Sequence, residues 1–185
     1  MQVRHGEVQL PAGFSLIWVK HRHGRHQATQ QIALLEGWGE LRGAIATSYS
    51  HDSHNLVVLG RSAEDMALAA NRLIASGGGM ALSRQGDILA HVAMPIAGML
   101  SDLPAAELAR QFGELRDPEA QKSPTGSRPT GVFKAIEGTC LACNAGPHLT
   151  DLGLTDGTTR QIVEPLIDCR ETPATDPHNN NLRGA

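Results

Sequence analysis

Aromatic side chains are scarce in this chain, at 3% of 185 residues, so its interior must be built from aliphatic side chains and alanine. No uncharged apolar run in the sequence approaches the ~20 residues that a membrane-spanning helix requires. The formal net charge is only −3, which provides no basic surface for nucleic acid or anionic lipid. We therefore expect neither nucleic acid nor a membrane among the partners.

Cysteine is also rare, with Cys140, Cys143 and Cys169 as the complete set. An odd count, in a chain whose first residues lack the apolar core of an export signal, argues against a disulfide framework and favours a cytoplasmic protein. The three thiols and His148 have the ligand types of a zinc site. However, only one closely spaced pair is present, and small cysteines more often pack as hydrophobic side chains. The role of the three cysteines stays open.

The length suits one compact domain. We divide the chain into an N-terminal lead-in (1–13), a folded domain (14–169) and a disordered tail (170–185), because the tail has too little apolar content to fold. Residues 117–129 are rich in proline, serine, glycine and charge, and this composition predicts a loop.

Runs of β-branched and apolar residues predict strands over 14–20, 31–39, 43–49, 55–60, 132–145 and 160–167. Residues 80–94 read as a hairpin that turns at 85–87. Helices are predicted over 62–76, where Ser62 is a candidate N-cap and three glycines follow the last turn, and over 104–116. Strand-rich segments interrupted by two helices predict an α+β fold: a largely antiparallel β-sheet packed by two main helices.

The periodicity of these segments also predicts which side chains are buried. The first helix has one apolar face at helical spacing, made by Met66, Ala69, Ala70, Leu73 and Ile74. The wider core is expected to contain Leu16, Val19, Ile45, Val57, Leu73, Leu82 and Ile96.

The stretch from Ser50 to Asn55 concentrates the chemistry of the chain. Two imidazoles, a carboxylate, two hydroxyls and an amide fall within six residues between two predicted strands. Loops held by rigid strands commonly present functional side chains. The candidate site residues are His51, Asp52, Ser53, His54 and Asn55.

Several segments together resemble one family. Residues 42–46, 51–55, 64–74, 77–79, 95–101, 146–150 and 152–154 occur in the order and spacing of the C-terminal domain of bacterial adenine deaminases, which belong to the amidohydrolase superfamily. The resemblance covers about residues 14–156. It implies a link to the hydrolysis of adenine to hypoxanthine and ammonia.

In that family the chemistry is carried by a metal-bearing (β/α)8 barrel that precedes this domain. Such a barrel needs ~250 residues, more than this whole chain. The resemblance therefore implies a divalent ion, Mn or Fe, that this chain does not hold alone, and a barrel subunit as partner. Self-association and a small purine ligand are further expectations. His21 and His23 imitate the barrel's His-x-His motif, but they are expected to form a polar strand end.

Three roles stay open for residues 51–55. Imidazole, carboxylate and amide groups suit the edge or lid of a purine-binding active site. His51 and His54 have the chemistry of an accessory metal site. Alternatively, the side chains bond to nearby backbone and fix a strand corner. The sequence also leaves open whether the chain takes part in catalysis or is a non-catalytic purine- or metal-binding domain that retains the fold.

Overall fold

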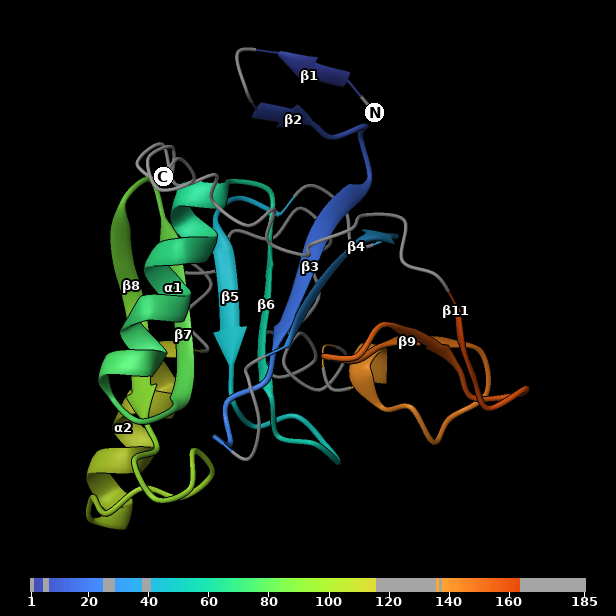
Figure 1. Cartoon of the computed structure of the whole chain (residues 1–185). Coiled ribbons are helices and arrows are strands. Elements are labelled where there is room, and N and C mark those ends of the chain that lie inside the picture. Colours follow the sequence, from blue (N-terminus) through green and yellow to red (C-terminus); the bar gives the residue numbers. More distant parts are fainter. Residues whose placement is uncertain are drawn as a thin grey trace, which may run out of the picture.

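A six-stranded antiparallel sheet forms the centre of the computed structural model (Figure 1), which describes residues 2–4, 7–24, 29–37, 41–115, 136 and 138–163. The strand order is β4-β3-β6-β5-β7-β8. The bounds are β3 (Phe14–Lys20), β4 (Gln30–Glu36), β5 (Ala44–Thr47), β6 (Leu56–Gly60), β7 (Gly79–Arg84) and β8 (Asp87–Ala93). The predicted α+β fold is confirmed.

Two smaller sheets flank the central one. A hairpin pairs β1 (Gln2–Arg4) with β2 (Glu7–Gln9), and a second sheet contains β9 (Pro147–Leu149), β10 (Leu154–Asp156) and β11 (Gln161–Val163). β11 confirms the start of the strand predicted over 160–167, whose remainder lies outside the described residues. The loop predicted over 117–129, the tail over 170–185 and Cys169 also lie outside them.

The strand predicted over 132–145 is wrong over its described part, and residues 132–135 and 137 lie outside the described residues. Ile136 and residues 138–140 are helical. Ile136 and Cys140 are both buried in the core, and their four-residue spacing places them on one face of a helix. A single buried pair in a short apolar run does not reveal this period in the sequence.

Helix α1 (Ala63–Ala75) begins and ends as predicted. The Ser62 hydroxyl accepts a hydrogen bond from the backbone N–H of Asp65 at 3.2 Å, which caps the first turn. At the other end, Gly77 N–H donates to Ile74 O at 3.3 Å and Gly78 N–H donates to Leu73 O at 2.8 Å. This is the Schellman arrangement, which satisfies the last carbonyls of the helix.

The glycines after α1 also permit a close approach between backbones. Gly79 has φ +134°, and a Cβ atom there would lie 1.9 Å from the carbonyl oxygen of Val92 in the paired strand β8. At Gly78, with φ +129°, a Cβ atom would lie 2.4 Å from the Cα atom of Gly98. Glycine is therefore required where α1 turns into β7.

Each face of the sheet has its own core. One face packs on α2 (Ala105–Leu115) and on the segment from Ile136 onward, and Leu108, Phe112 and Leu115 provide the predicted apolar stripe of α2. The opposite face packs on α1, and its buried side chains are Ala44, Ala46, Leu56, Val58, Met66, Ala69, Ala70, Leu73 and Ala81. Within the described residues, no helix is long and apolar enough to cross a membrane.

Most of the predicted core is confirmed, and two residues are not. Val19, Ile45, Val57, Leu73 and Leu82 are buried, and Leu16 is half-buried.

Ile74 is 59% exposed and Ile96 is 50% exposed, so the burial predicted for both is wrong. Ile74 lies roughly 80° around the helix from Met66, at the border of the apolar face. Ile96 follows β8 in a turn that bridges to Leu100, outside the layers of the sheet.

Candidate functional site

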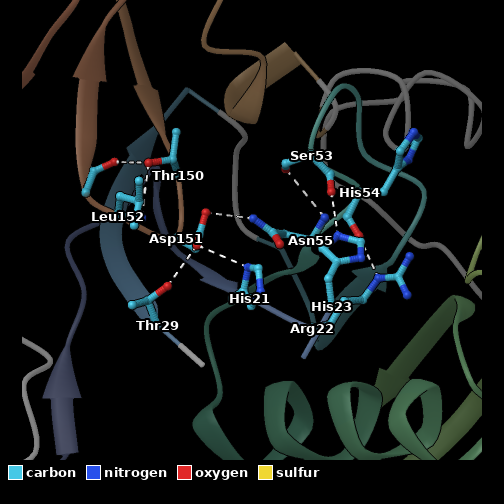
Figure 2. A network of polar contacts seen from close by, with 11 residues as sticks. His21, Arg22, His23, Thr29, Ser53, His54, Asn55, Thr150, Asp151 and Leu152 are labelled. Atoms are coloured by element: carbon cyan, nitrogen blue, oxygen red, sulfur yellow. Dashed lines mark hydrogen bonds and ion pairs between the residues drawn. The ribbon is translucent and has the colours of Figure 1, made fainter. Parts of the chain in front are cut away.

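The candidate loop, residues 51–55, joins β5 to β6 at one end of the central sheet. Two other segments reach the same place: residues 21–23, which follow β3, and residues 150–152, which connect β9 to β10 (Figure 2). Antiparallel pairing of β3 with β6 brings the first of these segments beside the loop. The loop is thus surrounded by polar side chains from distant parts of the chain.

The carboxylate of Asp151 joins these segments. It accepts hydrogen bonds from Asn55 Nδ2 at 2.9 Å and from Thr29 Oγ1 at 2.8 Å. His21 Nδ1 lies 3.4 Å from the same carboxylate. Asn55 is 1% exposed, so its amide is held inside the protein. This network anchors the end of the loop where β6 begins.

The backbone of the loop is held from the side of β3. Arg22 Nε donates to the carbonyl of His54 at 2.6 Å, and Arg22 Nη2 donates to the carbonyl of Ala97 at 2.6 Å. Partial burial lowers the pKa of the Arg22 guanidinium. His23 Nε2 lies 2.7 Å from the carbonyl of Ser53, which requires this nitrogen to carry the proton. The loop backbone is therefore fixed by Arg22 and His23 and, within the loop, by the Ser53 hydroxyl, which accepts from the Asn55 N–H at 3.5 Å. The side chains of His51 and Asp52 take no part in these bonds.

Three rings pack together at the start of the loop. The Nε2 atom of His51 lies 3.2 Å from the hydroxyl of Tyr49. The ring centroids of His51 and His54 are 5.0 Å apart, and those of Tyr49 and His54 are 5.7 Å apart. His51 is exposed and His54 is half-buried. His54 Nδ1 is buried without a hydrogen-bond partner among the described residues.

The surroundings of His54 favour its neutral form. Burial is the main cause of its lowered pKa, and the positive charges of His51, Arg22 and His23 act in the same direction. The carboxylate of Asp52 opposes the shift. Because the ordinary pKa of histidine is already about 6.5, His54 is a neutral imidazole near pH 7, with one nitrogen able to accept a proton.

The described residues do not fit the metal centre that the resemblance implies. No group of three or more histidine, cysteine, aspartate or glutamate side chains in this part of the chain is placed to hold a metal ion. His51 and His54 are neighbours, but the described residues provide no third ligand of that kind beside them, so the metal role of this pair stays a prediction.

The candidate zinc ligands Cys140, Cys143 and His148 also lie in surroundings that do not favour zinc binding. Cys140 is buried and Cys143 is exposed. Burial raises the pKa of the Cys140 thiol to about 11, which disfavours the thiolate that zinc requires. The ring nitrogens of His148 lie 3.0 Å and 3.3 Å from the carbonyls of Gly138 and Ala145.

The loop residues divide into two groups. His51, Asp52 and Ser53 are exposed, whereas His54 and Asn55 turn inward. Sequence reasoning placed all five in one site, but it missed the side chains that hold the loop, which are Arg22, Thr29, Tyr49 and Asp151. Arg22 lies between two conspicuous histidines, and that is the clearest signal the sequence offered.

Replacing His54 by glutamine should flatten the pH dependence of stability. The pKa of His54 is lowered from 6.5 in the folded chain. As the pH falls below about 6.5, the unfolded chain therefore binds a proton first, and the free energy of unfolding decreases. Urea unfolding between about pH 7.5 and pH 5 measures this slope. His91→Gln should flatten the pH dependence in the same way, because burial and the charge of Arg72 also lower the pKa of His91. Parallel curves for His54→Gln and the parent would contradict the prediction.

Comparison with known proteins adds a family match. The chain matches the adenine deaminase C-terminal domain family over residues 1–161. It is 82% identical over 185 residues to the adenine deaminase of Klebsiella pneumoniae (strain 342), a match that covers 100% of this chain and 30% of that protein. It is 80% identical over 174 residues to the adenine deaminase of Serratia proteamaculans (strain 568), covering 94% of this chain and 29% of that protein.

A more distant relative shows the same pattern. The adenine deaminase of Escherichia coli O9:H4 (strain HS) is 39% identical over 170 residues, covering 86% of this chain and 28% of that protein. The chain therefore spans about 30% of the length of these curated relatives.

Proposed function

The chain belongs to the adenine deaminase C-terminal domain family, and from this premise we propose that it acts in the hydrolysis of adenine to hypoxanthine and ammonia. Its role is that of a domain beside a separate catalytic barrel. The exposed tip of the candidate loop, residues 51–53, forms the edge of the purine site. Support comes from the high identity to adenine deaminases, of which the chain covers only about 30%.

The observation that carries this proposal is the contrast between the fixed backbone of the loop and its exposed tip. Arg22 and His23 bond to two successive carbonyls of the loop, and Asp151 holds Asn55. The Ser53 hydroxyl accepts from the Asn55 N–H at 3.5 Å, as a strand corner requires, but the exposed side chains of His51 and Asp52 take no part in fixing the loop backbone. A polar tip on a fixed backbone is preorganised to contact a substrate bound on a neighbouring domain.

The tip residues have the chemistry that adenine requires. The carboxylate of Asp52 can accept a hydrogen bond from the exocyclic amine of adenine. The Nε2 atom of His51 is bonded to the Tyr49 hydroxyl, so its Nδ1 atom is free to form a hydrogen bond with a ring nitrogen of adenine. Neutral His54 supports the ring of His51 from inside through an edge-to-face contact, with ring centroids 5.0 Å apart. Hydrolysis also needs an activated water. We assign the Mn or Fe ion that would supply this water to the barrel, because the described residues of this chain do not fit a metal centre.

A cytoplasmic location is part of the same proposal. The three cysteines form no recognisable disulfide framework in the sequence, and Cys140 is a free thiol in the core. Free thiols are typical of proteins in reducing compartments.

Removing the tip side chains should lower activity without lowering stability. In an enzyme in which this chain replaces the matching 30% of the Klebsiella pneumoniae adenine deaminase, His51→Ala and Asp52→Ala should each reduce kcat/KM about 10- to 100-fold. Both side chains are exposed, so the free energy of unfolding should change by less than about 0.5 kcal/mol. Ammonia release from adenine and thermal unfolding measure the two effects.

The controls separate the loop from the rest of the enzyme. Asp87→Ala removes an exposed carboxylate from the far hairpin and should leave kcat/KM unchanged. The isolated chain should release no ammonia. If both loop variants retain the parent's kcat/KM, the loop is a strand corner, and the alternative of a non-catalytic domain is favoured.

A further inference from the structure

On one face of the central sheet, the covering helix α1 packs on only four of the six strands. Helix α1 packs on β5, β6, β7 and β8, and Figure 1 shows β3 and β4 beside this helix rather than beneath it. Leu16 and Trp18 project from β3 on the α1 side and remain partly exposed. The other face is packed by α2 and the C-terminal segments. The β3–β4 part of the α1 face therefore presents apolar side chains that the described residues leave partly exposed.

A groove of about 400 Å³ lies between α1 and the uncovered strands β3 and β4. Its lining is apolar except for one lysine and one asparagine. The strands contribute Leu16, Trp18, Lys20 and Ile32, and α1 contributes Ala63, Met66, Ala67, Ala70, Asn71 and Ile74. An apolar groove with a tryptophan at its floor has the composition of an interface core.

The groove continues to the candidate loop. A second pocket, of about 200 Å³, is lined by Ile74 and by Arg22. Ile74 also lines the groove, and Arg22 bonds to the backbone of His54. Ile96 and Leu100, both at least 50% exposed, belong to the turn whose Ala97 carbonyl binds Arg22. A polypeptide bound in the groove would therefore lie beside the loop.

The charges near the groove define the chemistry of its occupant. The ammonium of Lys20 lies 5.9 Å from the ring centroid of Trp18. Within the described residues, the ion pairs involve His21 and Arg110, so Lys20 and Arg22 have no carboxylate partner there. An occupant that complements this surface presents apolar side chains to the groove and a carboxylate to Lys20.

We propose that the α1–β3–β4 groove is the docking surface for the remaining part of the adenine deaminase polypeptide. This inference rests on the proposed function and identifies the face through which the two parts of the enzyme meet. In the relatives about 70% of the protein lies outside the region that this chain matches. Contact between that part and the groove places it beside residues 51–53, as a shared purine site requires.

A second copy of the chain fits the groove less well. A two-fold dimer apposes the same patch of both copies, so Lys20 would face a lining that contains no carboxylate. The positive side chains would then be buried without partners, which is costly.

Cysteine labelling tests the docking directly. Ala67→Cys places a thiol on the exposed wall of the groove, and Ile162→Cys places one at a site that is 61% exposed on β11. Each variant is made in a Cys143→Ser background, both in the isolated chain and in the chimeric enzyme with the Klebsiella pneumoniae remainder. Labelling by a maleimide is followed for each peptide by mass spectrometry. The thiol at position 67 should react at least tenfold more slowly in the chimera than in the isolated chain, and the thiol at position 162 equally fast in both.

Two outcomes of the labelling overturn the docking. Equal reaction of the position-67 thiol in the chimera and the isolated chain shows that the groove is free in the enzyme. Slow reaction in the isolated chain that becomes faster on dilution shows that a second copy covers the groove. Ammonia release by the same chimera is scored separately. A protected groove in an inactive chimera contradicts the proposed function alone, and a free groove in an active chimera contradicts the docking alone.

A charge placed in the groove provides an independent check. Ile74 is 59% exposed, so Ile74→Asp should leave the isolated chain folded. When the Klebsiella pneumoniae remainder is expressed as a separate polypeptide, the dissociation constant between the two parts should rise at least tenfold with Ile74→Asp. It should not change with Ile162→Asp, and equal affinities for the two variants would overturn the docking.

Discussion

Replacing Asp151 by alanine should destabilise the domain by about 3 kcal/mol, because a hydrogen bond to a charged group contributes about 1.5–3 kcal/mol and a buried donor left alone costs about as much. Asp151 accepts from Asn55, which is 1% exposed, and from Thr29. For a chain of this size the loss corresponds to a decrease in Tm of about 6–12 °C. Thermal and urea unfolding of the purified chain measure it.

Two comparison variants identify the cause of that loss. Asp151→Asn keeps one carbonyl acceptor and should lose roughly half as much stability. Asp87→Ala removes an exposed carboxylate and should change stability by less than about 0.5 kcal/mol. If Asp151→Ala were no more destabilising than Asp87→Ala, the anchoring of the loop by the β9–β10 turn would be refuted.

Replacing Gly79 by alanine should cost about 4 kcal/mol and leave little folded protein at elevated temperature. Alanine in the left-handed conformation at φ +134° costs about 1–3 kcal/mol. The new Cβ would also lie 1.9 Å from the carbonyl oxygen of Val92, and overpacking adds about 1–3 kcal/mol. Circular dichroism against temperature, supported by the yield of folded protein, provides the measurement.

The matched control is a glycine with no such constraint. Gly113 lies inside helix α2, and a Cβ atom there meets nothing within 4 Å. Gly113→Ala should therefore stabilise the domain by up to about 1 kcal/mol, the difference in helix propensity. Similar stability changes for the two glycine variants would show that the α1–β7 connection tolerates a side chain.

The sequence predicted the elements whose signals are local. The strands around the candidate loop are apolar runs bounded by turn residues, and α1 has a serine cap, an apolar face and a glycine stop within 18 residues of chain. The helical turn at Ile136 was missed because its only periodic signal is one buried pair with Cys140. The exposure of Ile74 and Ile96 depends on what packs against their segments, which no local pattern records.

The candidate site was predictable only in part for the same reason. Residues 51–55 stand out because their polar groups are adjacent in the sequence. The side chains that fix the loop come from elsewhere: the hydrogen bond between Asn55 and Asp151 joins residues that are 96 positions apart. A contact of that range depends on the whole topology, so the Asp151 network has no signal in the sequence near it, and Arg22 is marked only by its place between two histidines.

The 96-residue separation of Asn55 and Asp151 has a consequence for the order in which the domain is completed during synthesis. All six strands of the central sheet lie before residue 94, and chains fold from the N-terminus as they emerge. Ile136, Cys140 and Leu149, which close one side of the core, arrive later, and Asp151 follows them. The nascent chain can therefore pair its central strands while the loop is still tethered only by Arg22 and His23. The loop acquires its last anchor after nearly the whole domain has left the ribosome.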